Sequence, residues 1–150
     1  MNMSLRKYVD DDKICPHRSS SQEIAQLFRI VDRDLADASS NAISADRRHA
    51  TAYNAALQLA TIVMHASGYR AKSKVGHHWV TLVLIPEFMG KGKLAQARYF
   101  NACREKRNTT DYDYAGHISD AEVIALIKEV KAFKSEVINW LKKHHPLLIS

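Results

Sequence analysis

Apolar residues recur at helical spacing along most of the chain. Apolar side chains at i, i+3 and i+4 steps predict a first helix over about residues 21–40, with Ser21 as its N-cap. An alanine-rich pattern predicts a second helix over about residues 45–67, with Ser44 before it and Gly68 after it. Both stretches are long enough to be main helices of a bundle.

The second half of the chain has three further helical patterns. Residues 78–89 predict a short helix that Pro86 breaks into two pieces. Residues 94–108 predict a fourth helix, which follows a Gly-Lys-Gly-Lys loop. A capping box at residues 119–122, of the form Ser-x-x-Glu, predicts the start of a long final helix that ends just before Pro146.

These patterns predict an all-α fold, because no sustained alternation typical of a strand is present. We expect a helical bundle of four main helices plus one short broken helix. The bundle occupies residues 21–150. Residues 1–20, with three consecutive aspartates and Pro16, are predicted to be a flexible N-terminal tail.

Composition is that of a soluble single domain: 150 residues, 46% hydrophobic and 25% charged, with a net charge of +6. No apolar run approaches the ~20 residues of a membrane span, and no secretory signal is evident, so a cytoplasmic protein without membrane contact is expected. Two cysteines, Cys15 and Cys103, are too few for a disulfide framework, although one bridge between them stays open. The mild positive charge is compatible with nucleic acid and does not demand it.

Arg107 is the first candidate for chemistry. On a helix that begins near Leu94, it projects within ~20–40° of Phe100 and Cys103, on the apolar face. A charge on that face is costly unless it is paired. The pattern therefore predicts either a carboxylate partner, with Asp111 at i+4 the natural one, or an anionic ligand in a cleft.

A basic loop is the second candidate. Arg70, Lys74, His77 and His78 gather within nine residues and could bind phosphate, with His77 available as a general acid or base. The alternative is a solvated loop between helices. No metal site is predicted, because adjacent histidines on a helix point ~100° apart and Cys15-x-His17 lies in the predicted tail. No cofactor is expected.

The stretch 107–114 reads R-N-T-T-D-Y-D-Y and precedes the last helix of the predicted bundle. With this stretch, the chain resembles the HEPN (higher eukaryotes and prokaryotes nucleotide-binding) domain superfamily, most closely its small actinobacterial-type branch. The resemblance covers roughly residues 24 to 145. It also includes the segments Tyr53-Asn54-Ala55-Ala56-Leu57, Gly68-Tyr69-Arg70 and Gly76-His77-His78.

The resemblance implies a homodimer in which two motifs face each other across a cleft. Many members of the superfamily are metal-independent endoribonucleases, including toxins of toxin–antitoxin pairs. Their motif is an arginine, usually followed by a polar residue, and then a histidine, with four to six residues between the arginine and the histidine. In toxin forms a tyrosine two residues after that histidine can be modified by a nucleotidyltransferase-type antitoxin. Other branches lack the catalytic residues and bind RNA, nucleotides or proteins.

This chain departs from the ribonuclease motif at the histidine. Arg107 and Asn108 match, but Tyr112 stands in the place of the histidine, and Tyr114 takes the place of the later tyrosine. A tyrosine with a pKa near 10 is a poor general base at neutral pH. His117 lies ten positions after Arg107, beyond a glycine.

Two functions follow as hypotheses. The first is a binding module for RNA, a nucleotide or a protein partner, with Arg104, Arg107, Asn108 and Tyr114 at its site. The alternative is a metal-independent endoribonuclease that uses Arg107 with Tyr112, His117 or His77. Because positions 107 and 112 differ by ~140° around a helix, a shared site predicts a helix break at residues 109–111 or a contribution from a second copy.

Overall fold

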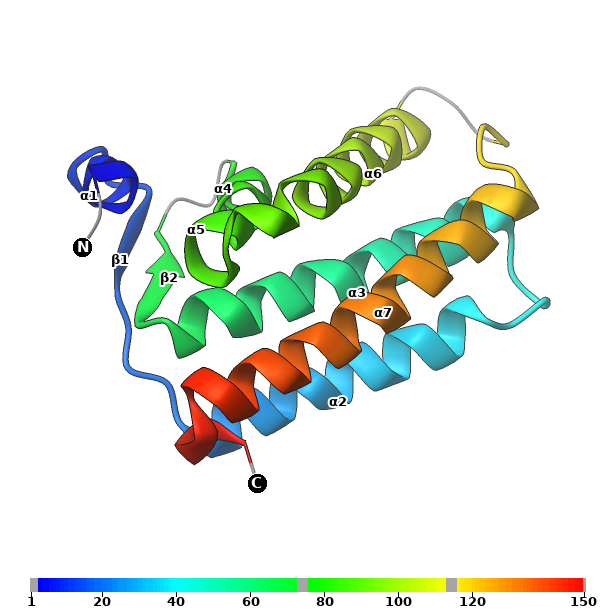
Figure 1. Cartoon of the computed structure of the whole chain (residues 1–150). Helices are drawn as coiled ribbons and strands as arrows, with labels where there is room; N and C mark the ends of the chain where they lie inside the picture. Colours follow the sequence, from blue (N-terminus) through cyan, green and yellow to red (C-terminus); the bar gives the residue numbers. More distant parts are fainter. Residues whose placement is uncertain (1–2, 73–75, 113–115, 150) are drawn as a thin grey trace.

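A computed structural model of the chain describes residues 3–72, 76–112 and 116–149, and only the backbone of residues 3–4 and 109–112. The predicted all-α bundle of four long helices with a short broken helix is confirmed. Figure 1 shows the elements, which are in chain order α1 (Met3–Asp10), β1 (Ile14–Pro16), α2 (Ser21–Ala38), α3 (Ala45–Ala66), β2 (Tyr69–Ala71), α4 (His77–Val83), α5 (Ile85–Met89), a 3₁₀ turn (Lys91–Lys93), α6 (Leu94–Tyr112), α7 (Asp120–His144) and a second 3₁₀ turn (Pro146–Leu148).

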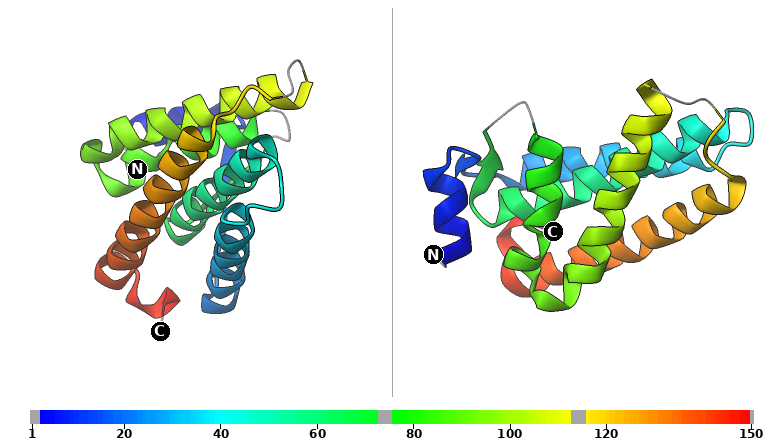
Figure 2. Two further views of the ribbon diagram at one scale, coloured as in Figure 1. Left: turned by 90° about the vertical axis from the view of Figure 1, so that its right-hand side faces the viewer. Right: turned by 90° about the horizontal axis from the view of Figure 1, so that it is seen from above.

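Helix α3 is the centre of the bundle. It packs against α2, α7, α6 and α4, and the two turned views in Figure 2 show these helices arranged around it. Its second half is buried on nearly every side, which is the pattern of a helix that lies inside a core. Small side chains at Ala52, Ala55, Ala56 and Ala60 are fully buried and let the neighbouring backbones approach closely.

Helix α7 closes the bundle against α3 and α6. Its buried stripe includes Phe133, whose ring lies 5.2 Å from the ring of Phe100 on α6, measured between centroids. The predicted capping box at Ser119 and Glu122 is confirmed. The Lys93 ammonium pairs with the Glu136 carboxylate, so the turn before α6 is also fastened to α7.

The N-terminal segment, predicted to be a flexible tail, contains a helix and a strand. Residues 14–16 form β1, which pairs antiparallel with β2 so that Cys15 lies opposite Arg70. Leu5 and Ile14 are buried in a second apolar cluster beside α4. A three-residue strand is too short to show an alternating pattern, and its partner β2 lies after α3, more than 50 residues later in the chain. The sequence pattern alone therefore could not reveal the pairing.

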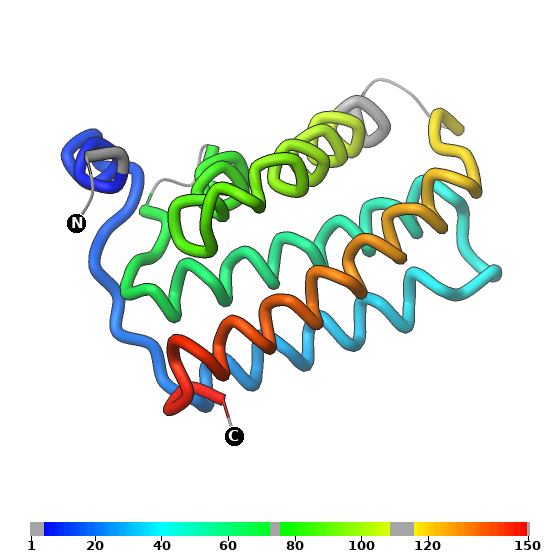
Figure 3. Tube along the Cα trace, viewed as in Figure 1, coloured from blue at the N-terminus to red at the C-terminus, as the bar shows by residue number. Residues whose placement is uncertain are grey.

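Two helix ends also differ from the predictions. The N-cap of α2 is Ser20, whose hydroxyl oxygen accepts a 3.1 Å hydrogen bond from the backbone N–H of Glu23, and not Ser21. Helix α6 continues to Tyr112, so the break predicted at residues 109–111 is absent from the described backbone. Figure 3 shows the path of α6 as a tube along the Cα trace.

Two further observations bear on the predictions from composition. Both cysteines, Cys15 and Cys103, are free thiols. No helix in the described ranges has the length and apolarity needed to cross a membrane.

Candidate functional site: a basic cleft between α4 and α6

A cleft of about 490 Å³ lies between the start of α4 and the second half of α6. The two helices run next to each other in Figures 1 and 2, and both rest on α3. Side chains that carry positive charge, hydrogen-bonding groups or an aromatic surface line it. They are His77, His78 and Trp79 with Gly76 from the α4 side, and Arg104, Arg107 and Asn108 from α6.

Helical spacing explains why α6 presents its three residues together. Arg104, Arg107 and Asn108 stand at i, i+3 and i+4, so they share one face of the helix. The Arg104 Nε donates a 2.8 Å hydrogen bond to the side-chain oxygen of Asn101, one turn earlier. The Arg104 guanidinium also lies 3.9 Å from the carboxylate of Glu105, which is largely exposed.

A left-handed glycine sets the start of α4. Gly76 has φ +77°, a conformation that costs other residues energy because their Cβ meets the backbone. The chain turns there, and the first three residues of α4 are all ring side chains. The rings of His77 and His78 meet edge to face with centroids 4.5 Å apart. Trp79 next to them is 38% exposed.

Tyr53 on α3 forms the support beneath both sides of the cleft. The Arg107 Cζ lies 5.8 Å from the centroid of the Tyr53 ring, within the range of a cation–π contact worth about 0.5–2 kcal/mol. The Tyr53 hydroxyl lies 3.4 Å from Nδ1 of His78. Tyr53 itself is only 1% exposed, so the arginine and the histidine are both held against a rigid part of the core.

The sequence offered two environments for Arg107, a carboxylate or an anionic ligand. The structure adds the aromatic face of Tyr53 to these. The proposed ion-pair partner, Asp111, has its side chain outside the described residues. Arg107 is half-buried, at the edge of the apolar face that carries Phe100 and Cys103, which is where the helical periodicity placed it.

Burial and neighbouring positive charge determine the protonation of the cleft. Burial lowers the pKa of His78 to about 4, and the charges of His77, Arg107 and Arg104 act in the same direction. Near neutral pH the His78 imidazole is therefore uncharged. Burial raises the pKa of Tyr53 above its usual value, so its hydroxyl stays protonated. Arg104 and Arg107 supply fixed positive charge to the cleft.

Most of the predicted phosphate-binding residues meet here. The structure brings together residues predicted from two separate stretches, namely His77, His78, Arg104, Arg107 and Asn108. Arg70 is not among the described residues that line the cleft; it lies on β2, close enough to His65 to influence its charge. Lys74 lies outside the described residues.

The predicted partners beyond Asn108 are placed differently. His117 is exposed, and the backbone N–H groups on either side of it, at Gly116 and Ile118, donate to the Asp46 carboxylate at the start of α3. That attachment directs residues 116–118 to the N-terminus of α3, and His117 is not among the described residues lining the cleft. Of Tyr112 only the backbone is described, and Tyr114 lies outside the described residues.

The sequence missed two residues of the site, Trp79 and Tyr53. Both read as core positions of helical patterns. The exposure of Trp79 depends on how α4 sits against α6, and Tyr53 precedes Arg107 by 54 residues, so only the tertiary contact of α3 with α6 relates them.

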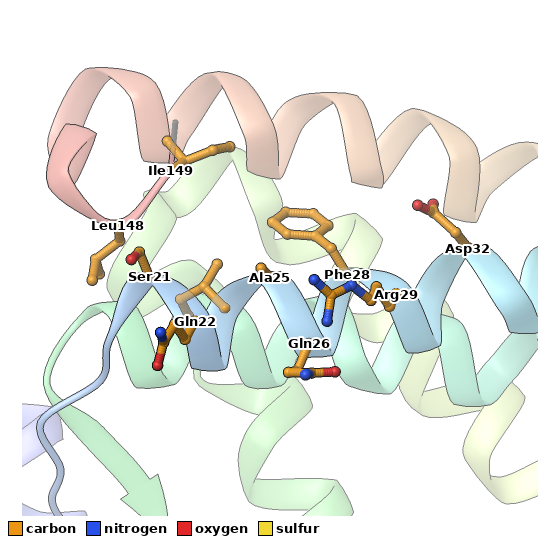
Figure 4. Close-up of a pocket in the computed structure, with 10 residues that line it drawn as sticks. Ser21, Gln22, Ala25, Gln26, Phe28, Arg29, Asp32, Leu148 and Ile149 are labelled. Carbon is orange, nitrogen blue, oxygen red and sulfur yellow. The ribbon is translucent and has the colours of Figure 1, made fainter.

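A second hollow of about 620 Å³ runs along α2 and under the C-terminal turn, with Phe28, Leu148 and Ile149 among its lining residues (Figure 4). Its two charged lining residues, Arg29 and Asp32, have opposite signs. No titratable groups of one sign converge there, in contrast to the cleft between α4 and α6. We therefore assign the candidate site to that cleft.

Comparison of the chain with protein-family models, with curated proteins and with solved structures finds no match. The function is therefore argued from the cleft itself.

Proposed function

We propose that the cleft between α4 and α6 binds single-stranded RNA and that the chain acts as a HEPN-like binding module. The observation that supports this most strongly is the convergence of Arg104 and Arg107 with the exposed ring of Trp79 on one hollow surface. Guanidinium groups suit phosphate because their planar donors match two of its oxygens. An exposed aromatic ring beside them suits an unpaired base.

The electrostatics of the cleft favour an anionic ligand. None of the described residues that line it is acidic, and the side chain of Glu105, whose carboxylate lies 3.9 Å from the Arg104 guanidinium, is 67% exposed to solvent. An ion pair so exposed is weak, and a phosphate can displace it at small cost. The net charge of +6 adds a modest general attraction for RNA.

The choice of binding over catalysis follows from the residues beyond Arg107. Where the resembling ribonucleases have a histidine, this chain has Tyr112, and α6 continues as a helix to that position. Positions 107 and 112 of a continuous helix differ by ~140° around its axis, so they face apart within one copy. A second copy, as the resemblance implies, would be needed to bring a residue of this part of the chain to Arg107.

The first prediction concerns Arg107→Ala. We expect the affinity for a fluorescently labelled single-stranded RNA to fall about ten- to hundredfold, because one charge-assisted contact is lost. The slope of log affinity against log salt concentration should decrease by about 0.7, the value of one phosphate contact on a single strand. Fluorescence anisotropy at several salt concentrations measures both.

Arg98→Ala is the matched control. Arg98 lies on the same helix nine residues earlier, about 180° from Arg107, and is exposed. Its removal takes away the same charge and should change the affinity less than twofold. If both variants weaken binding equally, the attraction is general and the cleft is not the site. If Arg107→Ala lowers the melting temperature and leaves RNA affinity unchanged, Arg107 serves the fold through Tyr53.

A second candidate function, metal-independent RNA cleavage, is favoured by one observation. The structure brings His77 and His78 into the cleft of Arg107, although 30 and 29 residues separate them from it in sequence. In such a reaction the 2′-hydroxyl attacks the adjacent phosphorus, its proton passes to an imidazole, and the bond from phosphorus to the 5′-oxygen breaks. That oxygen takes up a proton, which leaves a 2′,3′-cyclic phosphate and a 5′-hydroxyl, while Arg107 stabilises the charge on phosphate.

The two candidates are separated by incubating the chain with the same RNA in EDTA. Cleavage that is lost in Arg107→Ala and in His77→Ala, and that spares an RNA with a 2′-deoxy residue at the cut, supports the ribonuclease. Intact RNA with measurable affinity supports the binding module. A homodimer, a cytoplasmic location and a nucleotidyltransferase-type partner stay predictions of the resemblance, and sedimentation velocity tests the first of them.

A further inference from the structure

A cluster of two histidines and one glutamate shares no residue with the cleft between α4 and α6. His17 precedes α2, Glu23 is in the first turn of α2, and His65 is in the last turn of α3. Among the described residues these three form a group whose ligand atoms all lie within 4.8 Å of one another. Glu23 is 6 residues from His17 and 42 residues from His65 in the chain, so the spacing of the sequence does not predict the cluster.

Both imidazoles lie within hydrogen-bonding distance of the Glu23 carboxylate. His17 Nε2 lies 2.9 Å from Oε1 and 3.0 Å from Oε2 of Glu23, and His65 Nδ1 lies 3.1 Å from the same Oε1. Ligand atoms about 2.0–2.1 Å from a tetrahedral Zn²⁺ stand roughly 3.3 Å apart. Each imidazole nitrogen is therefore within a few tenths of an ångström of that separation from a carboxylate oxygen of Glu23. The two nitrogens lie within 4.8 Å of each other, so side-chain rotations would bring all three ligands around one ion.

The backbone around the cluster is fixed on all three sides. The backbone N–H of Glu23 donates a hydrogen bond to the Ser20 hydroxyl oxygen, and the Ser19 hydroxyl donates a 3.0 Å hydrogen bond to the carbonyl oxygen of His65. The His17 N–H donates a 2.8 Å hydrogen bond to the carbonyl oxygen of Gly68. These contacts tie the segment before α2 to the end of α3, so the three ligands are positioned before any ion binds, which lowers the cost of binding.

Partial exposure leaves room for one more ligand. The side chains of His17, Glu23 and His65 are 23%, 31% and 17% exposed, so the cluster is neither sealed in the core nor spread on the surface. Two imidazoles and a carboxylate form the ligand set of zinc sites that keep the fourth position for water or substrate, whereas closed structural sites use four protein ligands. Imidazole nitrogen also selects Zn²⁺ over Mg²⁺ or Ca²⁺, which prefer oxygen.

We propose that His17, Glu23 and His65 form a binding site for a divalent transition metal ion, zinc in the first place, with one coordination position open to water or an external ligand. The ion would join the segment before α2 to the ends of α2 and α3. This site is independent of the RNA-binding proposal, because none of its ligands lines the cleft between α4 and α6.

The test uses the metal-free full chain. Isothermal titration with Zn²⁺ should give one saturable site per chain and raise the melting temperature, because the ion binds the folded chain preferentially. Titration with Co²⁺ should give the visible absorption of a four-coordinate nitrogen–oxygen site. In Glu23→Gln and His65→Ala the affinity should fall more than about tenfold, since even changes outside the ligand shell cause losses of that size.

Two control variants separate this site from the other histidines. His144→Ala removes an exposed histidine at the end of α7, and His77→Ala removes one member of the adjacent pair in the cleft. Both should keep the stoichiometry and affinity of the wild-type chain. Far-UV circular dichroism checks the fold, and the nearly isosteric Glu23→Gln retains hydrogen-bonding groups if His65→Ala does not fold.

The proposal is overturned if the wild-type chain shows no saturable Zn²⁺ binding. It is also overturned if binding survives Glu23→Gln and disappears in His77→Ala or His144→Ala. In either case the cluster is a hydrogen-bonded brace between α2 and α3 only. The RNA measurements with Arg107→Ala are unaffected by these outcomes, so the failure of one proposal is distinguishable from the failure of the other.

Discussion

Single residues in this chain owe their properties to the side chains packed against them. Arg107 shows this most directly, because its guanidinium stacks over Tyr53 while lining a cleft that also contains His78. The same arginine contributes to the low pKa of His78. One cation thus couples the stability of the core to the chemistry of the cleft.

The pKa of His78 predicts a pH dependence of stability. The unfolded chain takes up a proton at this residue near pH 6.5, whereas the folded chain does so near pH 4, so acid between these values favours unfolding. After allowance for solvent screening, we expect the free energy of unfolding to fall by about 1–2 kcal/mol across this range because of His78. Buried His49 and half-buried His65, whose pKa values are also lowered by burial, add to the decline.

Urea denaturation at pH 7, 6, 5 and 4.5 measures this effect. His78→Asn should flatten the decline by the stated amount, while His144→Asn, a change at an exposed position on α7, should leave it as in the wild-type chain. An unchanged pH profile in His78→Asn would show that this imidazole takes up its proton equally in the folded and unfolded chain.

At the scale of elements, local hydrogen bonds decide where a helix begins, and residue type alone does not show which of several serines forms them. Three consecutive serines lie at the start of α2, at positions 19 to 21, and each has a different role. Ser19 binds the carbonyl oxygen of His65, Ser20 caps α2, and Ser21 is its first helical residue. The sequence predicts a cap within this run, and the backbone angles at Ser20, φ −122° and ψ 162°, select one member of it.

This assignment predicts different costs for two neighbouring substitutions. Ser20→Ala should lower the free energy of unfolding by about 1 kcal/mol, because the N–H of Glu23 loses its acceptor. Ser21→Ala, at an equally exposed position, should change it by less than about 0.5 kcal/mol. Urea denaturation of both variants compares the two values, and the reverse order would restore Ser21 as the cap.

At the scale of the whole molecule, the bundle depends on α3 and on the contacts that α6 and α7 make above it. The rings of Phe100 and Phe133 are fully buried and join these two helices. Phe100 lies on the same helix as Arg104 and Arg107, so its contact with Phe133 also helps to set the positions of the two arginines.

Phe133→Ala should therefore be among the costly single substitutions. We expect a loss of about 3–5 kcal/mol in the free energy of unfolding, from lost burial and the cavity left against Phe100. Leu147→Ala, at a side chain that is 92% exposed, is the control and should stay within about 0.5 kcal/mol. Thermal or urea denaturation measures both values. A loss below about 1 kcal/mol in Phe133→Ala would show that neighbouring side chains fill the cavity and that Phe133 is not essential to the bundle.

The sequence by itself determined the helical elements and the face on which Arg107 lies. Periodicity over fifteen or more residues carries that information, and the capping box at Ser119 and the break at Pro86 were evident from single positions. It also placed Asn108 and His77 among the candidate residues. These features follow from local spacing, which a linear pattern records.

Only the tertiary structure decided which distant residues meet. It paired β1 with β2, placed Tyr53 under Arg107, brought His77 and His78 to α6, and gathered His17, Glu23 and His65 at one point. Each of these contacts joins segments that lie tens of residues apart, except for His17 and Glu23, which are six residues apart. Their proximity depends on how α3 packs against its neighbours. Apolar periodicity marks the buried face of a helix and does not record which other segment covers that face.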